Sequence, residues 1–465
     1  MMNIKHLFGS CLLATLALSS LQASAGNIDA VAARAAANSF LKHQTAKGML
    51  RSVSTADISL AHAEASEAVN GANDFYAFNI KGGGFVIIAG EDRATQVLGY
   101  SDRGQLDFIN LPYGLKGLLN GYKQEIEFLQ TYKGDDLVPV PRTFTAKGDI
   151  EPLIKTNWGQ EMPYYLQCPI YSGEYCVVGC VATAMAQVMK YWQYPESSPS
   201  LPRFYCSSIS QYVAALPATT FDYSLMINSY CHWDYDNSTL VQDTYTDAQA
   251  QEVAKLGRYC GQAVEMNYSP EGSGAYTNDQ LQAMKEFGYR SSAQYVQKSG
   301  WWSNNYTTEE WEEMMKTELN AGRPILYAAN DVNGGGGHAF ICDGYKSDGT
   351  FHFNYGWYGT CDGWYVSTAL NMTHRDGDYL RFNSGHEMLI GVEPPQGWTP
   401  PVSTLLGDVN KDGNVNIADV SALIDYLLSN DATNIDLQAA DMDSNNEVAI
   451  ADVSLLIDYI LNNNA

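Results

Sequence analysis

The stretch that decides the fold of this chain reads Gly179-Cys180-Val181-Ala182-Thr183-Ala184-Met185-Ala186-Gln187-Val188-Met189-Lys190-Tyr191-Trp192. It passes from a glycine-containing loop into residues that favour a helix and follow its period. Cys180 therefore stands at the expected start of the helix, where unpaired backbone N–H groups and the positive end of the helix dipole stabilise a thiolate. That environment is typical of a nucleophilic cysteine. A half-cystine is the alternative, and the local sequence alone leaves it open.

A nucleophilic cysteine needs a base, and the chain has eight histidines. His338 follows four glycines and leads into residues 339–345, which have the composition of a buried strand. A histidine that enters a core strand from a flexible loop can face a cleft, so we expect His338 to be the base. His352 is the second candidate. Because it alternates with aromatic residues over 351–354, we expect it on the other strand face as a structural group.

Three further residues have the chemistry to assist this pair. Asn354 lies just beyond the second histidine and can orient the His338 imidazole by a hydrogen bond, while Trp357 can shield that contact from water. Gln160 lies upstream of the nucleophile and carries an amide that can donate to a developing oxyanion. Taken alone, Gln160 would be interpreted as a surface amide in a turn.

From Trp158 to about Pro395 the chain resembles the streptopain-like cysteine peptidases, which have a papain-like architecture. The most specific matching motifs are Gly179-Cys180-Val181-Ala182-Thr183-Ala184 with the following Gln187, Gly337-His338-Ala339-Phe340, and Asn354-Tyr355-Gly356-Trp357. Three separated motifs in order are hard to obtain by chance. The family usually has tryptophan where this chain has Tyr355, which affects the aromatic cover and not the catalytic pair.

The resemblance implies a role for each residue of the site. Cys180 would attack the scissile carbonyl, and His338 would move the proton between the thiol and the leaving amine. Gln160 would contribute to the oxyanion hole and Asn354 would orient His338. The positions where the family binds substrate correspond to Ser273, Val332 and Gly337. The family tends to favour an apolar side chain just upstream of the cut, and we adopt that preference as an expectation.

The N-terminal residues have the pattern of a secretion signal. Lys5 and His6 precede an apolar run over 12–18, and Ala23-Ser24-Ala25 supplies small residues for cleavage. No later stretch is long and apolar enough to span a bilayer. We therefore expect a signal peptide over residues 1–25 and a secreted or cell-surface-associated product.

Residues 26–147 are expected to form a small α+β unit, with a helix over 31–41 and strands over 75–80 and 84–90. The string over 84–95 resembles part of the inhibitory prodomain of the same family. The resemblance implies a zymogen that is activated by a cut near Lys147. A catalytic domain over 148–395 and a proline-rich linker over 396–405 complete this part of the chain.

The C-terminal residues 406–465 contain an internal repeat, because Asp408–Leu428 returns as Asp441–Leu461. Each copy has acidic or amide residues at loop positions 1, 3, 5 and 12, followed by an amphipathic helix. This EF-hand-like spacing offers several oxygen ligands to a hard cation. The expected calcium ligands are Asp408, Asn410, Asp412, Asn414 and Asp419 in the first loop and Asp441, Asp443, Asn445, Glu447 and Asp452 in the second.

A duplicated loop with one helix per copy, and with aspartate at position 12, resembles the type I dockerin family. The resemblance implies docking onto a cohesin-bearing partner or scaffold. The alternative interpretation is an acidic, solvated loop before a surface helix, with no calcium bound.

Length and composition agree with this division. At 465 residues the chain should form several domains, and its net charge of −25 excludes nucleic acid as a natural partner. Removal of Cys11 with the signal leaves eight cysteines, whose pairing the sequence does not give. The expected fold class is α+β: a two-lobed papain-like peptidase with an α+β prodomain and a small all-α calcium-binding dockerin module.

The function expected from these features is that of a secreted zymogen cysteine endopeptidase. It would hydrolyse peptide bonds of protein or peptide substrates through a thioester acyl-enzyme, with calcium in the dockerin and no cofactor for catalysis. Two alternatives stay open. One is a non-catalytic, dockerin-bearing scaffold or adhesion protein, and the other is an acyl transferase that uses the same Cys-His chemistry.

Overall fold

The computed structural model describes residues 26–46, 57–134, 136–139, 148–234, 239–298, 306–330, 337–370, 372–374, 385–399, 406–410, 415–432, 435–442 and 448–463. Several predictions fall outside these residues and are not described: the signal peptide over 1–25, the cut near Lys147, and Val332. Within the described residues, no helix combines the length and the apolar character needed to cross a membrane.

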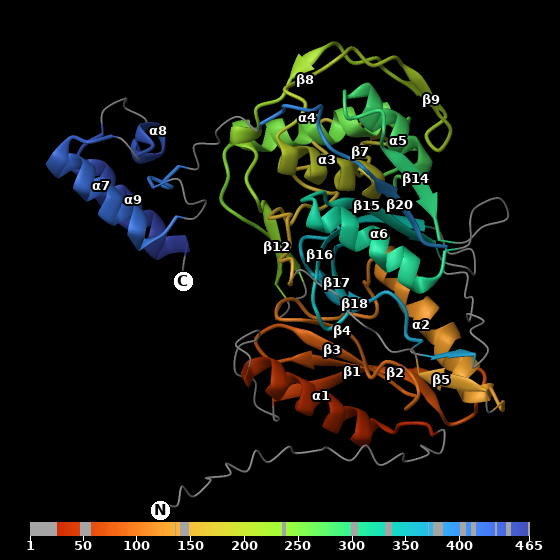
Figure 1. Cartoon of the computed structure of the whole chain (residues 1–465). Coiled ribbons are helices and arrows are strands. Elements are labelled where there is room, and N and C mark those ends of the chain that lie inside the picture. The colour runs from red at the N-terminus through yellow and green to blue at the C-terminus, as the bar shows by residue number, and fades with distance from the viewer. Residues whose placement is uncertain are drawn as a thin grey trace, which may run out of the picture.

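A ten-stranded antiparallel sheet runs through the expected prodomain (residues 26–147) and the expected catalytic domain (residues 148–395), which are called the prodomain and the catalytic segment below (Figure 1). In spatial order its strands are β1 (Ile58–Ala65), β2 (Asn73–Ile80), β3 (Phe85–Ala89), β4 (Val97–Ser101), β18 (Gly363–Val366), β17 (Thr350–Asn354), β16 (Gly337–Tyr345), β15 (Ile325–Asn330), β20 (Glu387–Ile390) and β14 (Gln294–Gln297). The expected strands over 75–80, 84–90 and 339–345 all belong to it.

The prodomain joins the catalytic segment edge to edge within this sheet. Strand β4 pairs with β18 through Gly99 opposite Tyr365 and Tyr100 opposite Trp364. A Cβ atom on Gly99 would lie 2.4 Å from the Tyr365 ring, so glycine is needed where the ring crosses the strand. The strands of the expected small α+β unit therefore continue the sheet of the catalytic segment.

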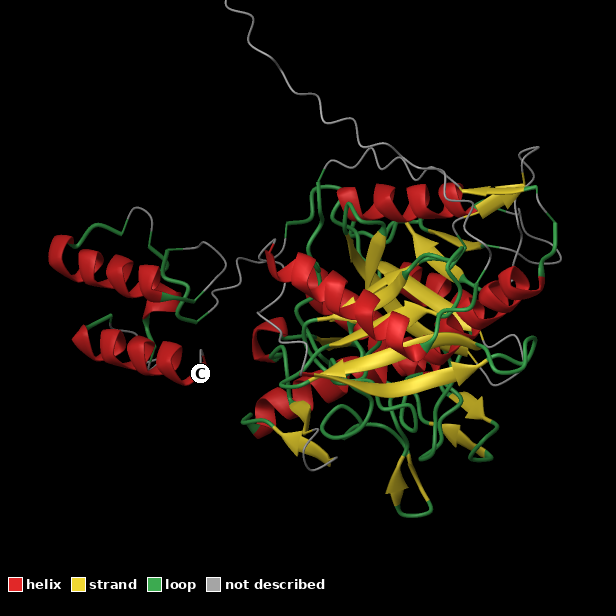
Figure 2. Ribbon diagram, turned by 90° about the horizontal axis from the view of Figure 1, so that it is seen from below, coloured by secondary structure: helices red, strands yellow, loops and turns green. Residues whose placement is uncertain are grey.

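Helices cover both faces of the sheet (Figure 2). On one face, the large catalytic core lies under α3 (Cys180–Trp192), α4 (Asp247–Ala263) and α5 (Thr277–Glu286). On the other face, α2 (Tyr113–Thr131) and α6 (Thr308–Asn320) pack against β15 and β16. Helix α1 (Ala30–Ala46) packs on the prodomain strands. The N-terminus of α3 meets β16 at the cleft.

The described residues also form short two-stranded sheets outside the ten-stranded sheet. They are β5 (Leu137–Pro139) with β19 (Met372–His374), β6 (Ile170–Tyr171) with β7 (Glu174–Tyr175), β8 (Ser197–Ser198) with β11 (Thr219–Thr220), β9 (Phe204–Cys206) with β10 (Gln211–Val213), and β12 (Cys231–Asp234) with β13 (Thr239–Gln242). A short 3₁₀ turn covers Tyr223–Leu225. After the catalytic segment, the Trp398 indole donates to the Trp192 carbonyl (3.2 Å), so the first linker residues still pack on α3.

The C-terminal residues form a small helical module with its own core, drawn in blue in Figure 1. Helices α7 (Ile417–Ser429) and α9 (Ile450–Asn463) are the two copies of the repeat, and α8 (Leu437–Ala440) lies between them in the chain. Val420 and Leu423 of α7 pack with Val453 and Leu456 of α9, which are the same positions in the two copies. The duplicated sequence therefore buries its two apolar stripes against each other.

Candidate active site

Helix α3 begins at Cys180 because Gly179 makes the turn before it. Gly179 has φ +89°, a region that residues with a side chain rarely adopt, and a Cβ there would lie 2.7 Å from the Met266 side chain. The backbone N–H and the hydroxyl of Thr183 both donate to the Gly179 carbonyl, which closes the first turn. The thiol is thereby held at the positive end of a buried helix.

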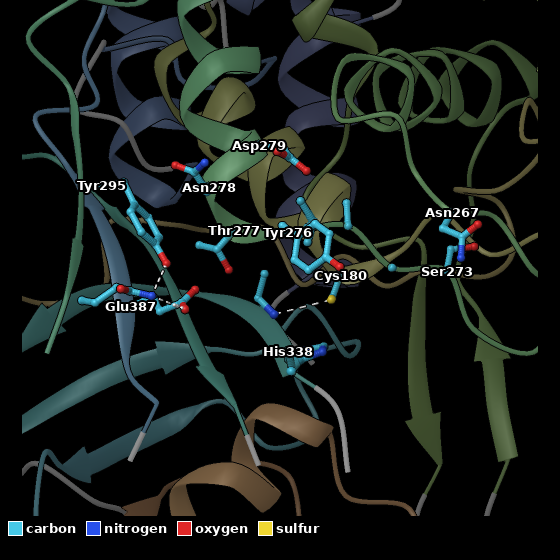
Figure 3. Close-up of a pocket in the computed structure, with 16 residues that line it drawn as sticks. Cys180, Asn267, Ser273, Tyr276, Thr277, Asn278, Asp279, Tyr295, His338 and Glu387 are labelled. Atoms are coloured by element: carbon cyan, nitrogen blue, oxygen red, sulfur yellow. Dashed lines mark hydrogen bonds between the residues drawn. The ribbon is translucent and has the colours of Figure 1, made fainter. Parts of the chain in front are cut away.

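Strand β16 brings His338 to this thiol, and the Ala339 N–H points at the Cys180 sulfur with an N to Sγ distance of 3.4 Å (Figure 3). Burial opposes ionisation of Cys180. The charge and hydrogen bond of His338, together with backbone N–H groups, outweigh burial and lower the pKa of the thiol below its ordinary value. Burial likewise opposes protonation of His338, but Cys180 and the Tyr355 carbonyl raise the pKa of the imidazole. Both shifts favour a thiolate–imidazolium pair.

The imidazole of His338 donates from Nε2 to the backbone carbonyl of Tyr355 (2.9 Å). The Trp357 ring lies edge-on to it, with 6.4 Å between ring centroids. Asn354 makes other contacts: its amide donates to the Thr156 carbonyl (2.8 Å) and its oxygen accepts from the Gly356 N–H (3.0 Å). In this structure, Asn354 therefore holds in place the segment whose Tyr355 carbonyl accepts from His338. A direct hydrogen bond between Asn354 and His338 stays a prediction.

Gln187 is a residue of this site whose role the sequence did not reveal. It is fully buried on α3, where its Nε2 donates to the Asn354 oxygen (3.2 Å) and its Oε1 accepts from the Thr156 hydroxyl (2.7 Å). It thereby connects the nucleophile helix to the strand end beside His338. The signal available in the sequence was a polar side chain among the apolar residues of this helix.

Gln160 lies beside the loop that leads to the nucleophile, because its carbonyl accepts a hydrogen bond from the Val178 N–H (3.0 Å). Its predicted donation to an oxyanion needs a bound substrate and stays a prediction. His352, the second candidate for the base, is buried with Nδ1 2.6 Å from the Asp343 carboxylate, and does not line the cleft. This is the structural role expected for it.

A cavity of 940 Å³ opens beside Cys180 and His338. Two of the three predicted substrate-binding residues, Ser273 and Gly337, line it. The Ser273 hydroxyl donates to the Val177 carbonyl (2.7 Å) and accepts from the Ser269 N–H (3.0 Å), so it also ties its loop to the segment before the nucleophile. The cavity has a size typical of ligand-binding clefts.

Helix α2 of the N-terminal segment touches His338 directly. A Cβ on Gly114 in α2 would lie 2.9 Å from His338 Cδ2 and 2.8 Å from the Phe340 ring, so the helix backbone packs on the His338 ring. Further along α2, Glu125 is buried and accepts hydrogen bonds from the Thr368 hydroxyl (2.8 Å) and the Ala369 N–H (2.6 Å) of the catalytic segment. Helix α2 thus connects the prodomain to the site.

The eight cysteines between residues 168 and 361 are all free thiols in this structure. Burial raises the pKa of most of them, to about 12 for Cys168 and Cys361 and about 11 for Cys176 and Cys231. Cys180 differs from these in the direction of its pKa shift and in being partly exposed.

The calcium prediction is only partly within the described residues, since Asp412, Asn414, Asp443, Asn445 and Glu447 lie outside them. In the described part no group of three or more acidic, histidine or cysteine side chains could hold a metal ion. Asp419 and Asp452 are nevertheless fully buried, and each carboxylate accepts hydrogen bonds from two backbone N–H groups of its own loop. In the first loop, the Asn410 N–H donates to Asp419 Oδ1 (3.1 Å). The position-12 carboxylate thus reaches back to the start of its loop, at position 3 in the first copy and position 2 in the second, and brings the two ends of each loop together.

Comparisons with known proteins find family models that match three segments of the chain. Residues 158–365 match the family model described as Peptidase C10 family, residues 25–126 that of the Spi protease inhibitor, and residues 406–461 that of the Dockerin type I domain. Streptopain of Streptococcus pyogenes is 27% identical over 371 residues, which cover 73% of this chain and 86% of streptopain.

Two further relatives extend the comparison. The thiol protease/hemagglutinin PrtT of Porphyromonas gingivalis is 30% identical over 403 residues, covering 81% of this chain, but the chain spans only 43% of PrtT. A structure of a prointerpain A fragment from Prevotella intermedia matches with a TM-score of 0.56 and 29% identity, over 72% of this chain and 98% of the fragment. The predicted papain-like fold with an inhibitory prodomain is confirmed, and residues 158–365 place the catalytic segment among the streptopain-like cysteine peptidases of the peptidase C10 family, with a type I dockerin domain at the C-terminal side.

Proposed function

We propose that this chain is an exported zymogen whose catalytic segment is an endopeptidase that hydrolyses peptide bonds of protein substrates through Cys180 and His338. The observation that carries the proposal is the electrostatic pairing at the start of α3: His338 lowers the pKa of the Cys180 thiol, and Cys180 raises that of the imidazole. A thiolate formed in this way is nucleophilic near neutral pH.

The reaction follows from this pair. The Cys180 thiolate attacks the scissile carbonyl carbon, and the oxyanion that forms accepts hydrogen bonds from the N–H groups at the helix start and from the Gln160 amide. The imidazolium of His338 gives its proton to the leaving amine, which leaves a thioester on Cys180. Water then loses a proton to His338 and attacks the thioester, and the carboxylic acid product departs as the thiolate re-forms.

The prodomain suppresses this reaction until it is removed. Two contacts support that role: the pairing of β4 with β18, and the packing of the α2 backbone on His338 at Gly114. The match to an inhibitor family over residues 25–126 points the same way. Maturation would release α2 from the histidine, which could then turn toward the Asn354 amide.

The dockerin module tethers the enzyme outside the cell. The duplicated calcium-binding loops would fold around two calcium ions, and the module would attach the peptidase to a cohesin-bearing partner. The family match over residues 406–461 supports this tether, and the N-terminal signal pattern supports export.

The test compares the wild type with Cys180→Ala on an unfolded protein substrate, under reducing conditions with calcium. We expect the wild type to produce new peptide ends and to lose its N-terminal segment, while the variant persists as an inert full-length precursor. Cys260→Ala, which removes a buried thiol from α4, is the matched control and should retain cleavage. If no substrate is cut even after the N-terminal segment has been removed by another protease, the proposal is wrong.

A further inference from the structure

The carbonyl that accepts the hydrogen bond of His338 belongs to a loop between two neighbouring strands of the sheet. Strand β17 ends at Asn354 and β18 begins at Gly363, and the two strands pair with Phe353 opposite Gly363. Strand β16, which carries His338, pairs with β17 on its other side. The loop over residues 355–362 therefore leaves the sheet beside His338.

The side chain of Asp362 closes this loop. Its Oδ1 accepts a hydrogen bond from the Tyr355 N–H (2.8 Å), seven residues earlier in the chain. Asp362 is buried, so water does not compete for this bond. A hydrogen bond to a carboxylate is shorter and about twice as strong as one between neutral groups. Without Asp362, the Tyr355 N–H would be left buried and unpaired.

The peptide unit that follows Tyr355 is held on both sides. Its carbonyl accepts from His338 Nε2 (2.9 Å), and its N–H, on Gly356, donates to the Asn354 oxygen (3.0 Å). The Tyr355 side chain is fully buried, and its hydroxyl has no hydrogen-bond partner among the described residues. The polar contacts that fix the direction of the Tyr355 carbonyl therefore come from its backbone, which Asn354 and Asp362 hold.

Several charged groups act on the Asp362 carboxylate. Burial raises the pKa of Asp362 to about 6, while His352 on β17 and the Tyr355 N–H oppose that rise. Asp343 on β16 adds to the rise, and Arg103, which follows β4, opposes it. A carboxyl group with a pKa of about 6 is mostly ionised at neutral pH. Asp362 therefore accepts from Tyr355 as a carboxylate under those conditions.

The contact between Asp362 and Tyr355 lies wholly within the catalytic segment. The Asp362 backbone also touches the prodomain, because its carbonyl accepts from the Ser101 hydroxyl (2.8 Å). That bond is lost when the prodomain is removed, whereas the bond from the Tyr355 N–H to the carboxylate can remain. The function of the carboxylate can therefore be tested in the matured enzyme.

We propose that Asp362 is a positioning residue for the catalytic step, because its carboxylate anchors the segment over residues 354–356 that orients His338 toward Cys180. The inference rests on the proposed peptidase function and adds a residue to its site. Asp362 is not among the described residues that line the cavity, so it acts through Tyr355 and not on the substrate. A loosened acceptor lets the imidazole turn away from the thiolate, and proton transfer to the leaving amine then becomes slower.

The experiment uses the full chain after maturation by another protease and measures kcat, KM and the pH profile of kcat/KM on one peptide. Asp362→Ala removes the acceptor of the Tyr355 N–H. We expect kcat to fall about tenfold or more, with KM within about twofold of the wild type. Burial opposes protonation of His338, and Cys180 and the Tyr355 carbonyl raise its pKa. Weakening the bond to that carbonyl should therefore move the basic limb of the profile to lower pH, by about half a unit or more.

Two variants separate this role from a general loss of stability. Asp362→Asn keeps an acceptor oxygen for the Tyr355 N–H and should restore the basic limb and most of kcat. Asp343→Ala is the matched control, since Asp343 is also fully buried and accepts a backbone N–H, from Ile154 (2.9 Å), but does not contact the loop over 355–362. It should lower the melting temperature and leave the basic limb in place.

A third variant, Asp362→Glu, serves if the alanine variant does not fold. It keeps the charge but moves the carboxylate by one methylene, and should show the same fall in kcat and the same shift. Wild-type kcat and an unchanged basic limb in Asp362→Ala, or in Asp362→Glu where the alanine variant does not fold, would overturn the positioning role. An equal shift in Asp343→Ala, or a loss in Asp362→Asn as large as in Asp362→Ala, would also overturn it. In each of these cases the peptidase proposal stands, whereas a wild type that cuts no peptide contradicts the peptidase proposal itself.

Discussion

All eight cysteines carry the same thiol group, so the residues around Cys180 must cause the difference in its pKa. His338 lowers the pKa of Cys180, whereas burial raises the pKa of Cys168, Cys176 and Cys231. A thiol with a lowered pKa keeps its thiolate as the pH falls, until the pH passes below that lowered value. We therefore expect iodoacetamide at about pH 6.5, well below the ordinary thiol pKa of about 8.5, to label Cys180 alone. Peptide mapping by mass spectrometry checks this.

The control for that prediction removes the charge that causes the shift. In His338→Ala the thiol keeps the helix start but loses the imidazolium, so labelling at about pH 6.5 should slow about tenfold or more, in line with a pKa rise of one unit or more. Equal labelling of several cysteines in the folded wild type would contradict the assignment of Cys180 as the activated thiol.

At the scale of the element, helix α2 carries two glycines that differ in what they touch. A Cβ on Gly114 would lie within 3.0 Å of His338 and Phe340, whereas one on Gly117 would lie 3.5 Å from the Ala329 methyl, an ordinary contact. Overpacking costs about 1–3 kcal/mol, so Gly114→Ala should weaken the hold of α2 on the catalytic segment and speed loss of the N-terminal segment roughly fivefold or more. A time course of precursor conversion, followed on gels, measures it.

Gly117→Ala is the matched control because it also replaces a glycine of α2 with alanine, which favours a helix by up to about 1 kcal/mol in its interior, without a close contact. It should leave maturation unchanged or slow it. If the two variants mature at the same rate, the contact at Gly114 does not restrain the zymogen, and the β4–β18 pairing would have to carry the inhibition.

At the scale of the whole molecule, the sheet unites prodomain and catalytic segment, whereas the C-terminal module has a core of its own. Calcium removal should therefore act on that module alone. In Cys180→Ala precursor, which cannot digest itself, we expect chelation to lower or abolish the calorimetric transition of the module and to leave the main transition in place.

The substitution that tests the same point is Asp419→Asn with Asp452→Asn. These carboxylates are fully buried and close the two loops through backbone N–H bonds, so the double variant should lose its response to calcium. A calcium-independent transition in the unsubstituted chain would contradict the predicted calcium sites. Peptide cleavage by the matured wild type should be the same with and without calcium.

The sequence by itself determined the parts of this protein that rest on local patterns. The helix that starts at Cys180, the strand that starts beside His338, and the duplicated helices of the C-terminal module follow from periodicity, glycine positions and repeated motifs within short windows. Only the tertiary structure decided which residues meet across long sequence separations. It paired β4 with β18, set the Gly114 backbone against His338, made Gln187 the partner of Asn354, and placed the Tyr355 carbonyl beside His338. Those contacts depend on strand register and helix packing, which no local pattern encodes because the same residues would fit many registers.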